Sequence, residues 1–356
     1  METQKKIVVG ISIGDLNGIG SEIVLKTLQD SRILAFFTPV LFANQKLMLH
    51  FNKVYGLDSK FNGINNLNAI APNKINVFNV WNESVAINFG KEDPTIGSYA
   101  IKSLKSAVSA LKEEKIDVLV TAPINKANIQ SDDFNFPGHT NFLNQELEGD
   151  SLMLLISGNL RVGLLTDHVP VKDVSQNITK ELVESKIKTI EKTLIQDFGI
   201  RKPKIAVLGI NPHNGDNGVI GNEDDTVLRP TLDSIRKNGI LVYGPYAADS
   251  FFGSGNHEKF DAVIASYHDQ GLIPFKTLSF GKGVNFTAGL NRIRTSPDHG
   301  TAYDVAGKNE ANHESFKEAV FSAIEIFKKR GEFKNLSQNP LKIVEQKRTQ
   351  NYTRNK

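Results

Sequence analysis

Short apolar runs alternate with amphipathic segments along most of this chain. Compact apolar runs predict buried strands at residues 7–13, 40–42, 75–78, 116–121, 152–156, 161–165, 205–209, 240–243 and 262–265. Apolar positions at steps of three and four predict a helix at residues 96–111, and further helices are expected at about residues 141–147, 179–197, 224–237 and 316–328. Strands that alternate with helices are typical of an α/β fold with largely parallel strand pairing.

The largest group of closely spaced candidate functional residues follows the last predicted strand. Residues 266–276 place His268, Asp269 and Lys276 directly after the apolar run 262–265. In open α/β sheets, ligands bind outside the carboxyl ends of the strands. We therefore interpret residues 266–276 as an active-site turn, with a plain surface turn as the alternative.

Two further histidines occupy the same kind of position. His168 and His213, like His268, each stand just past the end of a predicted strand, in separate turns. Three such side chains can converge on one metal ion and leave coordination positions open, which is the arrangement of a catalytic metal site. The alternative for each is a packed or surface histidine.

The chain contains no cysteine, so disulfides, thiolate metal sites and cysteine nucleophiles are excluded. A metal ion would be held by His, Asp or Glu, which leaves Zn²⁺, Co²⁺, Mn²⁺ or Mg²⁺ as candidates. Asp167, Asp249 and Asp269 stand near the histidines in sequence. They are candidates for orienting the metal ligands or for acid/base chemistry, with solvated turn residues as the alternative.

Cationic and helix-terminal groups concentrate around the same turns. The set is His139, Thr140, Lys276, Arg292 and Arg294. Lys, Arg and the N-terminus of a helix suit a phosphate or a carboxylate, although for Arg292 we favour a plain surface cation. A metal beside an anion-binding cluster indicates a small phosphorylated hydroxy acid as the substrate.

Length and charge narrow the class of protein. A chain of 356 residues suggests two domains or one large α/β domain. No run approaches the ~20 apolar residues of a membrane span and no secretory leader is visible, so we expect a cytoplasmic protein without a membrane partner. Residues 331–356 carry a net charge of +4, against +3 for the whole chain. A basic, flexible tail on a nearly neutral body is only weak support for a nucleic-acid partner, which usually needs a basic face on the fold itself, so we expect none.

Four motifs stand out together. They are Gly14-Asp15 with Gly18-Ile19-Gly20, Pro137-Gly138-His139-Thr140, Tyr267-His268-Asp269-Gln270-Gly271-Leu272 and Pro297-Asp298-His299-Gly300-Thr301-Ala302. In combination they resemble the 4-hydroxythreonine-4-phosphate dehydrogenase family of vitamin B6 biosynthesis, over residues 6–330. The glycine turn and the segment from His299 to Gly307 are also similar to the metal-dependent isocitrate and isopropylmalate dehydrogenases, which bind NAD without the G-x-G-x-x-G fingerprint that this chain lacks.

The resemblance implies two α/β/α domains with a cleft between them, residues 1–130 with 275–330 and residues 131–274. It implies one divalent metal ion, of zinc, magnesium, cobalt or manganese, on His168, His213 and His268, shared between the subunits of a homodimer. The implied substrate contacts are His139, Thr140, Lys276, Asn285 and Arg294. The implied NAD or NADP loop contains His299, Gly300, Thr301, Ala302, Asp304 and Asn312.

The expected reaction is NAD- and metal-dependent oxidation of 4-(phosphooxy)-threonine to a β-keto acid. That product would lose CO₂ to give 3-amino-2-oxopropyl phosphate in pyridoxal phosphate biosynthesis. Asp249 and Asp269 are the candidates for the base. The alternatives are oxidation of threonate or erythronate 4-phosphate, a non-catalytic phosphometabolite-binding protein, and a metal-dependent hydrolase that uses no NAD.

Overall fold

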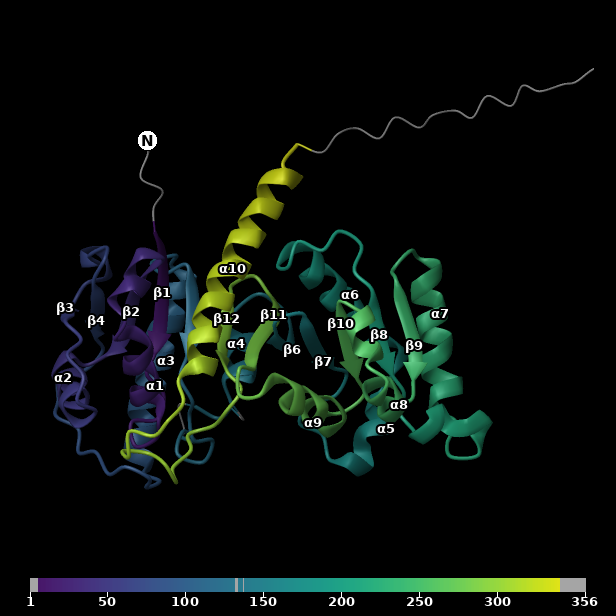
Figure 1. Cartoon of the computed structure of the whole chain (residues 1–356), viewed down its shortest axis with the longest axis horizontal. Coiled ribbons are helices and arrows are strands. Elements are labelled where there is room, and N and C mark those ends of the chain that lie inside the picture. The colour runs from purple at the N-terminus through teal and green to yellow at the C-terminus, as the bar shows by residue number, and fades with distance from the viewer. Residues whose placement is uncertain (1–5, 132–133, 137, 340–356) are drawn as a thin grey trace, which may run out of the picture.

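One mixed sheet runs through the protein, whose computed structural model describes residues 6–131, 134–136 and 138–339. Among these residues the sheet has 12 strands, in the order β3-β4-β2-β1-β5-β12-β11-β6-β7-β10-β8-β9 (Figure 1). The strands are β1 (Ile7–Ser12), β2 (Phe37–Ala43), β3 (Phe61–Ile64), β4 (Ile75–Asn79), β5 (Val118–Thr121), β6 (Gly149–Ser157), β7 (Leu160–Leu164), β8 (Ile205–Leu208), β9 (Val242–Tyr246), β10 (Ala262–Ala265), β11 (Val284–Leu290) and β12 (Arg294–Pro297). The α-helices are α1 (Gly20–Leu28), α2 (Gln45–Val54), α3 (Pro94–Lys112), α4 (His139–Glu146), α5 (Val174–Asn177), α6 (Lys180–Gln196), α7 (Arg229–Lys237), α8 (Ala248–Gly253), α9 (His268–Ser279) and α10 (Glu314–Ser337).

Strand direction divides the sheet into three parts. Strands β3, β4, β2, β1, β5 and β12 run parallel to one another, and so do β7, β10, β8 and β9. Between these blocks, β11 pairs antiparallel with β12 and β6, and β6 pairs antiparallel with β7. The expected α/β fold with largely parallel pairing is confirmed.

The chain leaves its first half and later returns to it. Strand β12 follows β11 but inserts beside β5, with Arg294 opposite Leu119. Helix α10 then packs against β12, β11 and β5 and crosses the middle of the molecule in Figure 1. Because one continuous sheet joins both halves, the division into two domains remains a prediction.

Local sequence explains where the main elements begin. Asp93 accepts the backbone N–H of Thr95 at the start of α3, and Thr179 accepts that of Leu182 at the start of α6. Such caps satisfy donors that a helix N-terminus leaves free. All residues of β2, β5, β8 and β10 are buried, as expected for parallel strands covered by helices on both faces. Among the described residues, no helix combines the length and apolar character of a membrane span.

Two expectations are wrong in detail. The stretch 266–276 is not a turn, because a helix begins at His268 and continues past Pro274. The proline lacks an N–H and so removes one helical hydrogen bond, which the rest of α9 tolerates. The tail does not begin at residue 331, because α10 continues to Ser337. Residues 340–356, like Pro137 of the second motif, lie outside the described residues.

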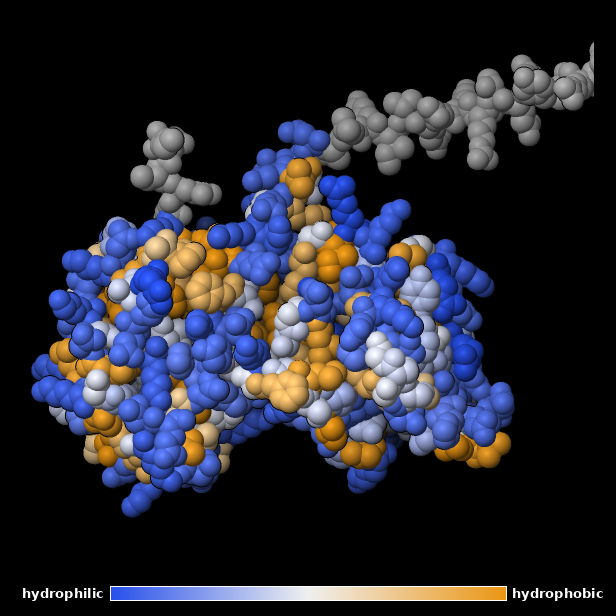
Figure 2. All heavy atoms as spheres, viewed as in Figure 1, coloured by the Kyte–Doolittle hydropathy of each residue, from blue (hydrophilic) through white to orange (hydrophobic). Residues whose placement is uncertain are grey.

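Apolar side chains reach the surface around α9. Ile273 is 64% exposed, and Phe280, just after the helix, is 85% exposed. Val171 and Val219, which follow β7 and β8 in the chain, are 75% and 82% exposed. Figure 2 shows hydrophobic side chains at the surface in the region of α9. Exposed apolar side chains such as Ile273 and Phe280 on and after α9 are typical of an interaction surface.

Candidate active site

A cavity of about 310 Å³ opens where the central strands end. Its wall combines the end of β5, strands β6, β11 and β12, the N-terminus of α4 and one face of α9. The cavity brings together nine of the predicted residues, His139, Thr140, His168, His268, Lys276, Asn285, Arg294, His299 and Gly300. His213, Asp249 and Asp269 are not in its lining, and neither are Thr301, Ala302, Asp304 and Asn312.

Arg294 brings an uncompensated charge to the cavity. The side chain is 2% exposed, and its guanidinium donates to the hydroxyls of Thr121 and Thr287. Within the described residues, no carboxylate forms an ion pair with it. Burial lowers the pKa of Arg294 to about 9, which leaves the group charged at neutral pH. Because a buried charge without a counter-charge is costly, the cavity is suited to receive an anion.

Two more polar atoms at this end of the cavity lack partners. The Nε2 atom of His139 and the Oδ1 atom of Asn285 are buried without a hydrogen bond to any described residue. The pKa of His139 lies well below its usual range because the ring is buried and because the cations of Arg294 and Lys126 are near. His139 is therefore neutral and can donate or accept a hydrogen bond. Orphaned polar atoms beside a bare cation indicate a polar ligand.

His139 should make the protein less stable in mild acid. In the unfolded chain a histidine takes up a proton as the pH falls through about 6.5, but folded His139 does not, so the free energy of unfolding falls with pH below that value. His139→Gln is expected to reduce this pH dependence by up to about 1.4 kcal/mol per pH unit. Urea unfolding at pH 7.5 and 5.5 measures the change. An unchanged slope would contradict the assignment of a neutral, buried ring.

Two of the three predicted metal ligands meet in the cavity. Strands β7 and β10 are neighbours, and the rings of His168 and His268 just beyond them lie 5.9 Å apart between centroids. Nδ1 of His268 is 2.7 Å from Oδ1 of Asp269, a contact that orients the ring and leaves Nε2 free. Burial lowers the pKa of His168, so its imidazole is neutral, as a metal ligand must be.

His213 lies elsewhere on the same edge of the sheet. It belongs to the segment Pro212–Gly218, in which five consecutive residues from His213 to Asn217 have positive φ angles. The buried Asp224 carboxylate holds the base of this segment by accepting the backbone N–H groups of Ile210 and Asn211. In the described part of a single chain, no three His, Asp or Glu side chains are placed to hold a metal ion.

The predicted cofactor loop packs against the glycine turn after β1. The backbone N–H of Ile19 donates to the carbonyl of Thr301 at 3.0 Å, and a Cβ on Gly18 would lie 2.9 Å from that oxygen. The hydroxyl of Tyr303 donates to Oδ2 of the buried Asp15 at 2.8 Å. The two motifs that the sequence singled out separately therefore form one surface, with His299 and Gly300 at the cavity.

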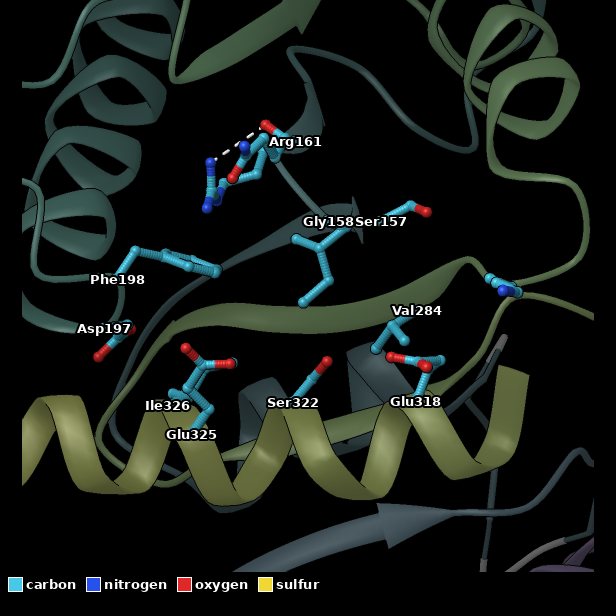
Figure 3. Close-up of a pocket in the computed structure, with 13 residues that line it drawn as sticks. Ser157, Gly158, Arg161, Asp197, Phe198, Val284, Glu318, Ser322, Glu325 and Ile326 are labelled. Carbon is cyan, nitrogen blue, oxygen red and sulfur yellow. Dashed lines mark hydrogen bonds between the residues drawn. The ribbon is translucent and has the colours of Figure 1, made fainter. Parts of the chain in front are cut away.

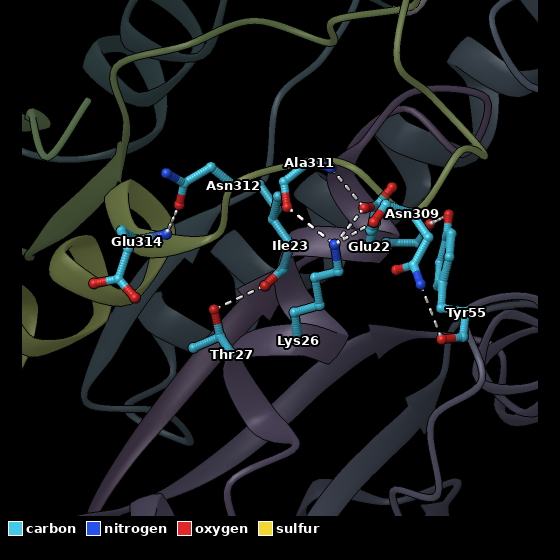
Figure 4. Close-up of polar contacts among 10 residues, drawn as sticks. Glu22, Ile23, Lys26, Thr27, Tyr55, Asn309, Ala311, Asn312 and Glu314 are labelled. Carbon is cyan, nitrogen blue, oxygen red and sulfur yellow. Dashed lines mark hydrogen bonds and ion pairs between the residues drawn. The ribbon is translucent and has the colours of Figure 1, made fainter. Parts of the chain in front are cut away.

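A buried ion pair fastens the far end of this loop to α1 (Figure 4). The Glu22 carboxylate is fully buried and accepts from Nζ of Lys26 at 2.7 Å and from the backbone N–H of Ala311 at 2.8 Å. Nζ of Lys26 also donates to the carbonyls of Asn309 and Ala311. The loop has little regular structure of its own, so these contacts determine where it lies.

Lys26→Met is expected to lower the free energy of unfolding by about 3 kcal/mol, because it strands the buried Glu22 carboxylate. Adding Glu22→Gln to this variant should restore most of the loss. Urea unfolding measures both, with Lys53→Met at an exposed position of α2 as the matched control. A single-variant loss no larger than that of the control would show that the pair does not stabilise the fold.

A second cavity, of about 480 Å³, lies on the other face of the sheet against α10 (Figure 3). Val284 lines this cavity, whereas its neighbour Asn285 lines the first, since side chains alternate along a strand. The guanidinium of Arg161 already donates to two backbone carbonyls, and Glu318 and Glu325 face the same space. No histidine is in its lining. The first cavity is therefore the better candidate for phosphate and metal chemistry.

Sequence reasoning missed three residues around Arg294. Lys126 lines the cavity, and Thr121 and Thr287 hold the guanidinium. Thr121 ends the strand predicted at residues 116–121, and its place at the carboxyl end of a strand could have identified it as a site residue. Thr287 gave none, because its role depends on β11 pairing with β12.

Known proteins resemble the chain over most of its length. The family model described as "Pyridoxal phosphate biosynthetic protein PdxA" matches residues 35–323. A 4-hydroxythreonine-4-phosphate dehydrogenase of Bacteroides thetaiotaomicron is 44% identical over 95% of this chain and 94% of its own. A D-threonate 4-phosphate dehydrogenase of Cupriavidus necator is 36% identical over 91% and 98%. The crystal structure of a 4-hydroxythreonine-4-phosphate dehydrogenase from Klebsiella pneumoniae has a TM-score of 0.79 at 30% identity, over 92% of this chain and 99% of that one.

Proposed function

Because the chain belongs to the PdxA family of pyridoxal phosphate biosynthetic proteins, we propose that it oxidises 4-(phosphooxy)-threonine. It is a dehydrogenase, an oxidoreductase acting on a CH–OH group. The observation that carries the choice of a phosphorylated substrate is the buried guanidinium of Arg294, which has no carboxylate partner in the described structure. A phosphate bound there would supply the missing counter-charge.

Different residues around Arg294 would bind different groups of this substrate. The Arg294 cation and the Lys276 ammonium would bind phosphate oxygens, and the orphaned polar atoms of His139 and Asn285 would complete its hydrogen bonds. His139 and Thr140 stand in the first turn of α4, where the helix dipole favours an anion. Anchoring the phosphate would bring the substrate's secondary hydroxyl toward His168 and His268.

We propose a divalent metal ion, of zinc, magnesium, cobalt or manganese, at these histidines. The donor set fits, since His168 and His268 offer imidazole nitrogens at the same wall of the cavity and Asp269 orients the second ring. When bound, such an ion lowers the pKa of a coordinated hydroxyl and stabilises developing negative charge. Asp269 and Asp249 are the candidates for the base that accepts the hydroxyl proton, with Asp249 exposed in the first turn of α8.

The third donor argues for a homodimer. His213 lies outside the cavity of its own chain, so His213 of the partner subunit would complete the metal site. The exposed apolar side chains of Val171, Val219 and Ile273 each lie within a few residues of one of the three histidines in sequence, and they suit an interface between copies. The site would then be shared between subunits, as the resemblance implies.

The cofactor would be NAD or NADP. His299 and Gly300 reach the cavity, and the loop that continues through Thr301, Ala302 and Asp304 to Asn312 lies against the glycine turn, where backbone N–H groups suit a phosphate. When bound, a nicotinamide would supply the hydride acceptor, and the residues of the cavity would orient the reacting carbon. The β-keto acid product loses CO₂ to give 3-amino-2-oxopropyl phosphate for pyridoxal phosphate biosynthesis. A cytoplasmic location remains a prediction.

The names of relatives favour one alternative substrate. A protein of Oceanobacillus iheyensis named "Putative D-threonate 4-phosphate dehydrogenase" and one of Cupriavidus necator named "D-threonate 4-phosphate dehydrogenase" are each 36% identical to this chain. The deciding experiment follows NADH formation with 4-(phosphooxy)-threonine, threonate 4-phosphate and erythronate 4-phosphate, each with divalent metal and with a chelator. The proposal requires the highest kcat/KM with 4-(phosphooxy)-threonine and loss of turnover with the chelator. NADH formation with none of the three would contradict it.

A further inference from the structure

The guanidinium of Arg294 is held entirely by uncharged groups. Nε and one terminal nitrogen donate to Oγ1 of Thr121, at 3.1 and 2.5 Å, and the other terminal nitrogen donates to Oγ1 of Thr287 at 3.1 Å. These are its only hydrogen bonds among the described residues. Both threonines are buried.

The sheet places one threonine on each side of the arginine. Strand β12 lies between β5 and β11. Arg294 is opposite Leu119, so Thr121 stands two residues further along β5 with its side chain on the same face. On the antiparallel side Phe286 pairs with Thr295, which brings Thr287 level with Arg294. The hydroxyls are therefore fixed by strand register rather than by flexible side chains.

Arg330 shows the usual arrangement in the same chain. Its Nε and one terminal nitrogen donate to the two oxygens of the buried Asp197 carboxylate, at 2.7 and 2.9 Å. That pair is internally neutral and leaves little charge for a ligand. At Arg294 a carboxylate from β5 or β11 would satisfy the same donors and would cancel the charge that faces the cavity.

We infer that Thr121 and Thr287 are positioning residues that hold Arg294 in place and leave its charge free for the substrate's phosphate. The inference rests on the proposed function for the identity of the anion. Thr121 is at the cavity wall, whereas Thr287 is not in the lining and acts only through Arg294. The class of ligand follows, since a bare buried cation favours a phosphorylated substrate over its unphosphorylated analogue.

The sharpest test introduces a negative charge at Thr287, which contacts Arg294 but does not line the cavity. Thr287→Asn keeps a neutral acceptor, whereas Thr287→Asp is nearly isosteric with it and introduces a carboxylate. Isothermal titration with inorganic phosphate and the KM for the phosphorylated substrate report anion binding. We expect Thr287→Asp to weaken both by at least about 50-fold and Thr287→Asn by no more than about 5-fold. The KM for NAD should change in neither variant.

A second pair tests the hydroxyl of Thr121. Thr121→Val removes the acceptor and should weaken phosphate binding by about 10-fold or more, and Thr121→Ser keeps it and should remain within about 3-fold of wild type. Thermal melting shows whether each variant is folded. If a variant at one threonine fails to fold, the pair of variants at the other threonine still tests the inference. The effect should fall on KM for the phosphorylated substrate and spare kcat at saturation.

Equal phosphate affinities in the Thr287→Asn and Thr287→Asp variants would overturn the inference. If both variants lost the same affinity, the packing of residue 287 and not its charge would determine phosphate binding. An unaffected Thr121→Val variant, or wild-type protein that binds no phosphate, would overturn it as well. Failure of the proposed function looks different. In that case wild type and Thr287→Asn would bind phosphate and Thr287→Asp would not, but none would reduce NAD with any phosphorylated four-carbon acid.

Discussion

Arg294→Met is expected to lower kcat/KM for the phosphorylated substrate by about 10³-fold, or about 4 kcal/mol, and at the same time to stabilise the fold. The loss follows because Arg294, the only fully buried cation among the described residues that line the cavity, would bind the phosphate in a water-poor environment. The gain in stability follows because the free variant no longer buries a charge that lacks a counter-charge. Methionine has a similar length, so the substitution should raise the free energy of unfolding by about 1 kcal/mol. Steady-state NADH formation and urea unfolding measure the two effects.

Arg330→Met is the matched control with the opposite signature. Its partner Asp197 is fully buried, so removal of the arginine strands a carboxylate and should cost about 3 kcal/mol of stability. The Arg330–Asp197 pair is outside the first cavity, so kcat/KM per folded molecule should be unchanged. If Arg294→Met destabilised the protein as much as Arg330→Met does, the charge of Arg294 would be structurally compensated and the phosphate assignment would lose its main support.

His268→Ala is expected to abolish metal-dependent NADH formation, by at least about 10³-fold, because it would remove a donor of the proposed metal site and with it several kcal/mol of charge stabilisation. His213→Ala should do the same, although His213 is outside the cavity of its own chain. His50→Ala, at an exposed position of α2, is the control and should be fully active. Full wild-type activity in the presence of a chelator would contradict the metal site.

Mixing the two inactive variants tests whether the site is shared. If His268 of one chain works with His213 of the other, each mixed dimer regains one intact site. Random exchange between equal amounts should then recover about one quarter of wild-type activity. Mixtures that remain inactive after subunit exchange would place all ligands of a site on one chain and would refute the shared arrangement.

Sequence reasoning located the site by the ends of strands. His168 and His268 meet because β7 and β10 are neighbours whose carboxyl ends share an edge, and that rule needs no knowledge of side-chain packing. The resemblance to the 4-hydroxythreonine-4-phosphate dehydrogenase family is confirmed by the PdxA match over residues 35–323 and by the 44% identical relative. The roles of individual residues within the site remain predictions.

What could not be predicted depends on contacts between distant parts of the chain. The path that carries His213 away from the cavity is held by Asp224, whose bonds reach back to Ile210 and Asn211. No local pattern announces five consecutive positive φ angles, even though His, Asn and Asp tolerate them better than most residues. The helix at 268–279 was hidden by Pro274, which usually argues against a helix interior.

The late return of β12 to the first half of the sheet has a consequence for synthesis of the protein. Thr121 and Arg294 are separated by 173 residues, so the ribosome must complete most of the chain before their hydrogen bonds can form. Until then the edge of β5 that later pairs with β12 is unpaired, and the proposed phosphate-binding residues are not yet together. A product truncated before residue 294 would thus be inert toward the substrate and exposed to aggregation, which gives quality control a clear marker of an unfinished molecule.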